Sequence, residues 1–104
     1  MKTEFLPEAD EEFREAVRYY ESEAPGVGMA FAVAIHKAVA GMAEFPLAAP
    51  LIRAGIRKKP LRHFPYNVLY SVESDTLLIV AVAHQKRRPS YWRGRLKKPP
   101  NIPH

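Results

Sequence analysis

The chain has 104 residues, which fits one domain, and 47% of them are apolar, which excludes an intrinsically disordered protein. It contains no cysteine, so disulfides, thiolate nucleophiles and cysteine metal sites are excluded, and a cytoplasmic location is expected. The N-terminus lacks the apolar segment of a signal peptide, and no apolar run approaches the roughly 20 residues of a membrane span. We therefore expect no association with a membrane.

The net charge of +5 is distributed very unevenly along the chain. Residues 1–52 carry four basic and nine acidic side chains, a formal charge of −5, whereas residues 53–104 carry twelve basic and two acidic ones, a formal charge of +10. A strongly basic half attracts a polyanion, which could be a nucleic acid, an enzyme bound to nucleic acid or an acidic protein segment. The alternative is a basic surface that only keeps the protein soluble, but the imbalance favours a binding function.

Patterns in the first half predict one strand and two helices. Lys2–Leu6 is a short strand candidate, and Pro7 suits the first position of a helix, where its missing N–H costs nothing. The acidic side chains that follow Pro7 are favourable at the positive end of the helix dipole, and we expect most of them to face solvent. An apolar stripe ends before Pro25-Gly26, and a second stripe from Val27 to Met42 ends before Phe45-Pro46. The short connection predicts an antiparallel helical hairpin.

Patterns in the second half predict a loop, three strands and a short helix. The loop covers Leu47–Ala54. The first strand is confined to an edge or bulged by Pro60, the second alternates, and the third is continuously apolar, as in a central strand covered on both faces. The three strands are Gly55–Leu61, Tyr66–Val72 and Leu77–Ala83, and the last two form a hairpin. Ser90 is expected to cap a short helix from Tyr91 to about Lys97.

This order of elements predicts an α+β fold, with the helical hairpin packed on one face of a small sheet of about four strands. The other face is expected to be open and to carry basic residues from the strands that build it. We expect a single domain at 1–98, followed by a Pro-rich tail at 99–104.

Two basic clusters are the candidate functional residues. In the first cluster, Arg57 and Lys59 share one face of their strand while Lys58 lies on the other, and Arg62 and His63 follow. Two cations on one sheet face could hold a phosphate backbone, although a charged edge strand that resists aggregation has the same pattern.

The second cluster, residues 84–95, mixes cations and aromatic rings, as nucleic-acid surfaces do. His84 could be a general acid or base, or it could fix the end of its strand by hydrogen bonds to the backbone. Trp92 more often anchors a short helix than stacks on a base. The other candidates for binding a target in this cluster are Lys86, Arg88, Arg93 and Arg95.

Other chemistries find no support in the sequence. There is no Gly-rich phosphate loop and no HExxH motif, and the four histidines lack metal-ligand spacing. We therefore predict neither a metal site nor a cofactor.

Eight short motifs in this order resemble the RelE/ParE toxin superfamily, and more closely its ParE-like branch, the plasmid stabilisation proteins. They extend over residues 3–95. They are Phe5-Leu6-Pro7-x-Ala9, Tyr19-Tyr20-Glu21, Gly28-x-x-Phe31, Phe45-Pro46, Ile56-Arg57, Phe64-Pro65-Tyr66-x-Val68-x-Tyr70, Ala81-Val82-Ala83-His84 and Arg87-Arg88-Pro89-x-Tyr91-Trp92.

The resemblance implies a microbial-RNase-like fold and the toxin role in a bacterial type II toxin–antitoxin pair, with an acidic antitoxin as partner. It also implies two alternative targets. ParE-like members inhibit DNA gyrase and are not known as nucleases, whereas RelE-like members cut messenger RNA on the ribosome. A degenerate toxin that only binds a partner is a third alternative.

The resemblance to RelE-type nucleases places Arg57, Lys59 and Arg87 at catalytic positions, with Tyr91 or His84 as further candidates if the chain is a ribonuclease. Such enzymes stabilise the transition-state charge with cations and move protons through a positioned group. Asn67 departs from the pattern, because RelE-type sequences have an arginine there and asparagine cannot supply a fixed charge. This departure favours the ParE-like, non-enzymatic interpretation.

Overall fold

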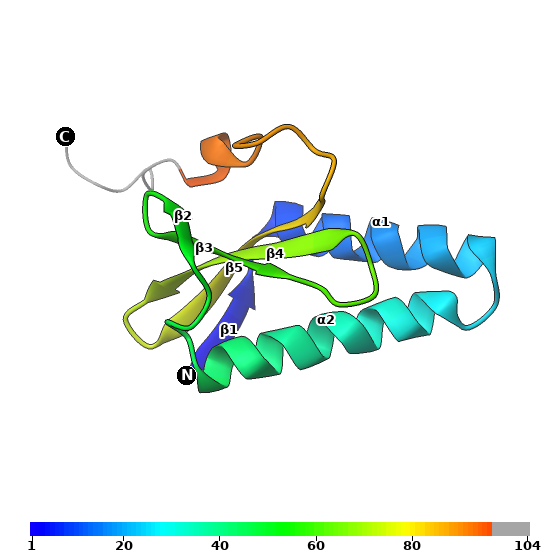
Figure 1. Ribbon diagram of the computed structural model, residues 1–104, viewed down its shortest axis with the longest axis horizontal. Helices are drawn as coiled ribbons and strands as arrows, with labels where there is room; N and C mark the ends of the chain where they lie inside the picture. Colours follow the sequence, from blue (N-terminus) through cyan, green and yellow to red (C-terminus); the bar gives the residue numbers. More distant parts are fainter. Residues whose placement is uncertain (97–104) are drawn as a thin grey trace.

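The computed structural model describes residues 1–96, so the predicted tail at 99–104 lies outside the described residues. Two helices, α1 (Pro7–Glu23) and α2 (Val27–Glu44), form a hairpin against one face of a five-stranded sheet (Figure 1). The strands are β1 (Lys2–Phe5), β2 (Leu51–Arg53), β3 (Ile56–Pro60), β4 (Tyr66–Glu73) and β5 (Thr76–His84). Their order is β1-β5-β4-β3-β2, with β1 parallel to β5 and the other pairs antiparallel. The predicted α+β class and helical hairpin are confirmed.

The sheet has five strands rather than about four, because the predicted loop at Leu47–Ala54 contains β2. Arg53 pairs with Ile56, so only Ala54 and Gly55 connect β2 to β3. Both have positive φ, 51° and 80°, as a tight turn between antiparallel strands requires. Gly55 adopts this conformation at no steric cost, and the hairpin adds β2 to the edge of the sheet.

The main core lies between the helices and the sheet. Phe31 and Ile35 of α2 and Val68 and Tyr70 of β4 are fully buried there. An aromatic group closes one end of this core, with ring centroids 5.0–5.3 Å apart for Phe31 against Tyr20, Phe64 and Tyr66. The alternation predicted for the strand Tyr66–Val72 is confirmed, because Val68 and Tyr70 lie in this core whereas Leu69 lies in a second apolar cluster.

The two helices approach most closely at Gly28. A Cβ atom at this position would lie 2.6 Å from the Val17 carbonyl oxygen, so only glycine fits without movement. The Glu21 carboxylate of α1 accepts hydrogen bonds from the backbone N–H groups of Gly26 and Gly28 at 3.0 Å each. A side chain of α1 therefore satisfies donors at the first turn of α2 that have no partner within the helix.

The face of the sheet opposite the helices is partly covered, which corrects the prediction that it is open. The C-terminal segment, residues 85–96, returns across this face (Figure 1). Trp92 is 3% exposed and packs in a second apolar cluster with Ile56, Leu69 and Val80.

The predicted helix from Tyr91 to about Lys97 is instead a single 3-10 turn, Arg93–Leu96, and Lys97 lies outside the described residues. Ser90 does not begin an α-helix, because it has a φ of 69° and lies in the turn that precedes the 3-10 turn.

Candidate functional site

β5 contains a bulge at Val80, next to the candidate site. Ile79 pairs with Tyr70 and Ala81 pairs with Leu69, so Val80 has no partner on β4. The side chains of Val80 and Ala81 both belong to the apolar cluster away from the helices, whereas Ile79 belongs to the core beneath them. A bulge re-aims the residues that follow it. β1 pairs with β5 only as far as Ile79, so the edge of β5 is free of a neighbouring strand after this residue. The Val80 carbonyl and the Val82 N–H lie at this free edge, where side chains bind them.

Glu12 of α1 and Arg95 of the C-terminal segment occupy this edge. Their side chains form a bidentate pair, with Nη1 of Arg95 2.9 Å from Oε1 of Glu12 and Nη2 2.7 Å from Oε2. Glu12 Oε1 also accepts the Val82 N–H at 3.0 Å, and Arg95 donates to the Val80 carbonyl oxygen at 3.1 Å. The pair therefore satisfies backbone groups that another strand would otherwise bind.

Tyr91 completes this cluster. Its hydroxyl group donates to Oε2 of Glu12 at 2.6 Å, and the guanidinium groups of Arg87 and Arg95 lie 3.9 Å and 4.9 Å from the centre of its ring. Cations over an aromatic face are attracted by its electron density. The C-terminal segment is thus fixed to α1 through one carboxylate.

The electrostatics agree with a charged Glu12 and a neutral Tyr91. Burial would raise the pKa of Glu12, but hydrogen bonds from Arg95, Tyr91 and the Val82 N–H outweigh burial and hold that pKa below its usual 4.5. Burial and the hydrogen bond to Glu12 raise the pKa of Tyr91 well above its ordinary range. The hydrogen bond to Glu12 likewise raises the pKa of Arg95.

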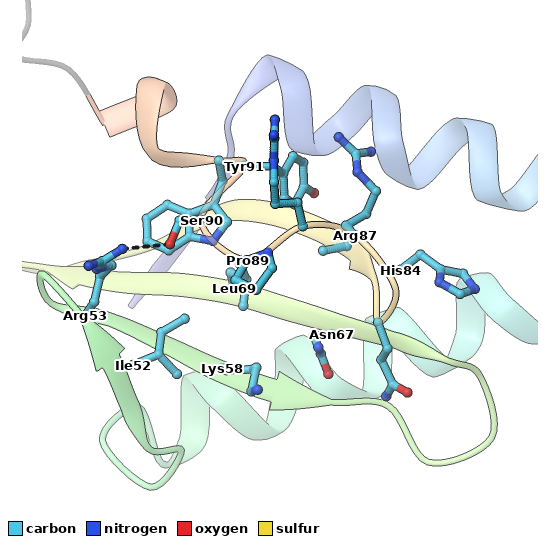
Figure 2. A pocket seen from close by; sticks show the side chains of 14 residues that line it. Ile52, Arg53, Lys58, Asn67, Leu69, His84, Arg87, Pro89, Ser90 and Tyr91 are labelled. Atoms are coloured by element: carbon cyan, nitrogen blue, oxygen red, sulfur yellow. Dashed lines mark hydrogen bonds between the residues drawn. The ribbon is translucent and has the colours of Figure 1, made fainter.

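A basic groove of about 390 Å³ lies between the C-terminal segment and the sheet (Figure 2). We define it by Arg53 and Lys58 on one side, Asn67 and Leu69 on its floor, and residues 87–92 on the other side. Among residues 1–96, no acidic side chain lines it, and Arg53 donates to the Ser90 hydroxyl at 2.8 Å across it. The groove combines this positive charge with an apolar lining, to which Ile52, Pro89 and Trp92 contribute.

The structure divides the five residues of the ribonuclease interpretation into two groups, Arg57 and Lys59 on β3 and the other three at the end of β5 and beyond it. Arg57 and Lys59 pair with Tyr70 and Val68, whose side chains lie in the core on the helix side of the sheet. Arg57 donates from Nη1 to the backbone carbonyl oxygens of Leu47 and Ala49 at 3.1 and 2.7 Å. Arg57 therefore supports the connection after α2, and neither it nor Lys59 lines the basic groove.

Arg87, Tyr91 and His84 do lie near one another, but their functional atoms are engaged or point elsewhere. Arg87 extends toward α1 and away from Lys58 (Figure 2), over the Tyr91 ring. The His84 Nδ1 atom accepts the backbone N–H of Lys86 at 3.1 Å, and its ring packs against Tyr66 with centroids 5.2 Å apart. These contacts match the alternative in which His84 fixes the end of its strand.

The remaining predicted residues are distributed over four places. Lys58 and Arg88 line the basic groove, and Arg62 lies in the connection between β3 and β4. Trp92 and Arg95 are held inside the structure, whereas Lys86 and Arg93 are exposed. Sequence reasoning missed Arg53 and, above all, Glu12, which was expected to be surface charge. Its signal was its position, three residues after Ala9 and four before Ala16, both of which are buried.

Within residues 1–96, no group of three or more His, Cys, Asp or Glu side chains is arranged to hold a metal ion. The groove offers cations and an amide, which suit an anionic partner rather than a cation.

Comparisons with known proteins agree with this geometry. Residues 3–89 match the family model described as ParE toxin of type II toxin-antitoxin system, parDE. A solved structure of the chromosomal ParDE system from P. aeruginosa superimposes with a TM-score of 0.69 at 16% identity, over 81% of this chain and 95% of that one. The toxin–antitoxin complex RelBE2 from Mycobacterium tuberculosis gives 0.55 at 22% identity, over 80% and 95%. A search among curated proteins finds no match. At these identities the two structures establish the fold.

Proposed function

The chain belongs to the ParE toxin family of type II toxin–antitoxin systems, and from this premise we propose that it arrests bacterial growth by binding and poisoning DNA gyrase. We further propose that an acidic antitoxin neutralises it, and that both encounters take place in the cytoplasm. The two similar solved structures are described as a ParDE system and as a toxin–antitoxin complex, which supports a protein partner for this chain.

The composition of the basic groove carries the proposal for the target. Lys58 and Arg88 line it without a carboxylate among the lining residues, so the groove attracts an acidic protein surface or a nucleic-acid-bound enzyme. Its floor holds Asn67, the position at which the resemblance to RelE-type nucleases calls for an arginine. The groove therefore suits binding better than stabilisation of a phosphorane charge.

The proton-transfer groups near the groove support the same choice. RNA cleavage by the neighbouring 2′-hydroxyl needs a side chain that accepts or donates a proton at the reacting atoms. The Tyr91 hydroxyl group donates to Glu12 and has a raised pKa that opposes its ionisation, and one of the two ring nitrogens of His84, Nδ1, accepts a hydrogen bond from the backbone N–H of Lys86. A toxin that acts by binding does not need the Tyr91 hydroxyl or His84 Nδ1 to be available for proton transfer.

Two assays run side by side with the purified chain test the proposal. We expect DNA supercoiling by gyrase to be inhibited at micromolar or lower toxin concentration, and messenger RNA in a translation reaction to remain intact. Codon-positioned cuts in that RNA, with gyrase unaffected, would replace the proposal by the RelE-like function. Activity in neither assay, together with harmless expression without antitoxin, would identify a degenerate toxin.

A further inference from the structure

Exposed apolar side chains gather in the connection from α2 to β2, at the β2 edge of the sheet (Figure 1). Phe45, Leu47 and Leu51 are 63%, 67% and 58% exposed, and residues 45–52 carry no charge. Within residues 1–96, this segment holds half of the large apolar side chains that are exposed. Apolar side chains that gather on a surface in this way mark a site of interaction.

Side chains of the sheet hold this connection in place. The Tyr70 hydroxyl group donates to the Pro46 carbonyl oxygen at 2.9 Å, and Arg57 donates to two further carbonyl oxygens of the connection at 3.1 and 2.7 Å. Leu51 pairs with Arg57, so both side chains lie on the helix side of the sheet. The exposed side chains are therefore fixed before any partner arrives, and little ordering opposes binding.

A pocket of about 350 Å³ opens beside these side chains. It is lined by the end of α2 with Phe45, by residues 48–50 and 58–60, and by Tyr70. A Cβ atom at Gly41, which lines it, would meet nothing within 4 Å, so the pocket is open at the helix end. We call Phe45, Leu47, Leu51 and this pocket the edge patch. It offers both protruding apolar side chains and a recess that can receive one.

Two charges at the edge patch complement each other. Glu44 ends α2, where a carboxylate meets the negative end of the helix dipole, and the last turn of α2 has no basic residue. Lys59 lines the pocket and is exposed. In the described part of the chain, neither side chain forms a salt bridge. The fitting partner supplies a cation, a carboxylate and an apolar side chain, and a second edge patch supplies all three.

We propose that two copies of the chain associate through their edge patches around a twofold axis. In such an interface the same surface serves both copies, so each Leu47 enters the pocket of the other copy and each Glu44 faces Lys59 of the other copy. The edge patch is smaller than the about 20–30 residues per side of stable complexes, so we expect a Kd on the order of 10 µM. Neither Leu47 nor Lys59 lines the basic groove, so dimerisation does not depend on the proposed inhibition of gyrase.

Leu47→Glu, with Met29→Glu as its matched control, tests the apolar contact. Both residues are exposed, but Met29 lies on α2 outside the edge patch. Sedimentation of the purified full chain over a concentration series measures the Kd, because the average mass rises from that of one chain toward that of two. We expect Leu47→Glu to weaken self-association by about tenfold or more, and Met29→Glu to change it by less than about twofold.

Glu44→Lys and Lys59→Glu test the charge pairing by reversal. Each substitution alone places like charges together twice in the symmetric dimer, so each should weaken self-association by about threefold or more. The double variant restores opposite charges and should regain the affinity of the unmodified chain, which a general loss of stability would not produce.

A chain that stays monomeric throughout the concentration series would overturn the inference. So would self-association that is equally strong in Leu47→Glu, or a double charge variant weaker than both single ones. A monomeric chain that binds phosphatidylglycerol vesicles, with binding lost in Leu47→Glu, would assign the edge patch to a membrane instead. By length and composition α2 would suit a membrane span, but Phe31, Ile35 and Met42 bury one of its faces in the core, so binding would take place at the membrane surface.

Discussion

Glu12 and Arg95, 83 residues apart in the sequence, form a bidentate ion pair whose side chains are each 15% exposed. The pair joins the first helix to the last turn that the structure describes, and it saturates the edge of β5 beyond the bulge at Val80. It therefore sets the position of the C-terminal segment, and with it one wall of the basic groove.

Glu12→Gln should destabilise the protein by about 2–3 kcal/mol, because it leaves the Arg95 guanidinium largely buried without its countercharge. The free energy of unfolding in urea measures this loss. The single tryptophan, Trp92, lies in the same segment, and its fluorescence should become more accessible to a quencher.

Glu11→Gln is the matched control for this substitution. Glu11 faces Arg18 at 3.4 Å, and both side chains are more than half exposed, so the change should be within about 0.5 kcal/mol. Equal stability of the two variants would show that the Glu12 pair does not hold the segment.

The same carboxylate predicts a dependence on pH. The pKa of Glu12 is lower in the folded protein than its usual 4.5, so its contribution to stability is fully present above that value and is lost as the pH falls through the folded pKa. The difference in unfolding free energy between the native chain and Glu12→Gln should therefore shrink below about pH 4.5. A difference that stays constant from neutral to acid pH would rule out this origin.

The two helices and β4 were predictable because their apolar residues follow the periods of 3.6 and 2, and β5 was predictable because its continuous apolar run is typical of a central strand. The register of β3 against β4 confirms the predicted alternation of Arg57 and Lys58. β2 was not predictable from periodicity, since Leu51, Ile52 and Arg53 are all exposed. The bulge at Val80 is hidden in a continuous apolar run, which has no polar residue to mark a face. The pairing of Glu12 with Arg95 depends on that bulge and on where the chain returns, so composition alone could not reveal it.

Gly28→Ala and Gly41→Ala, two substitutions in α2, should have opposite effects. A Cβ at Gly28 meets the Val17 carbonyl oxygen and the Glu21 side chain, so Gly28→Ala should cost about 1–3 kcal/mol. A Cβ at Gly41 meets nothing within 4 Å, so Gly41→Ala should stabilise the helix by about 0.5–1 kcal/mol. Thermal melts of both variants measure these changes, and a stabilising Gly28→Ala would contradict the described helix contact.

Arg57→Ala should act on stability rather than on function. The substitution removes both hydrogen bonds to the carbonyl groups of Leu47 and Ala49, so the free energy of unfolding should fall by about 1–3 kcal/mol. The control Lys59→Ala changes an exposed side chain, and its unfolding free energy should fall by less than about 0.5 kcal/mol. Urea unfolding measures the stability, and gyrase inhibition is assayed at a temperature at which both variants are folded. If Arg57 and Lys59 instead act together in RNA cleavage, both substitutions should abolish messenger RNA cleavage, and the two variants should have the same stability.

Titration of purified gyrase with the toxin, read as loss of DNA supercoiling, tests the central claim most directly. The unmodified chain and the Lys86→Glu variant, which is altered outside the basic groove, should inhibit supercoiling equally. The double variant Lys58→Glu and Arg88→Glu should need at least about tenfold more protein for the same inhibition. Full supercoiling in the presence of excess unmodified chain, or equal inhibition by the groove variant, would contradict the account.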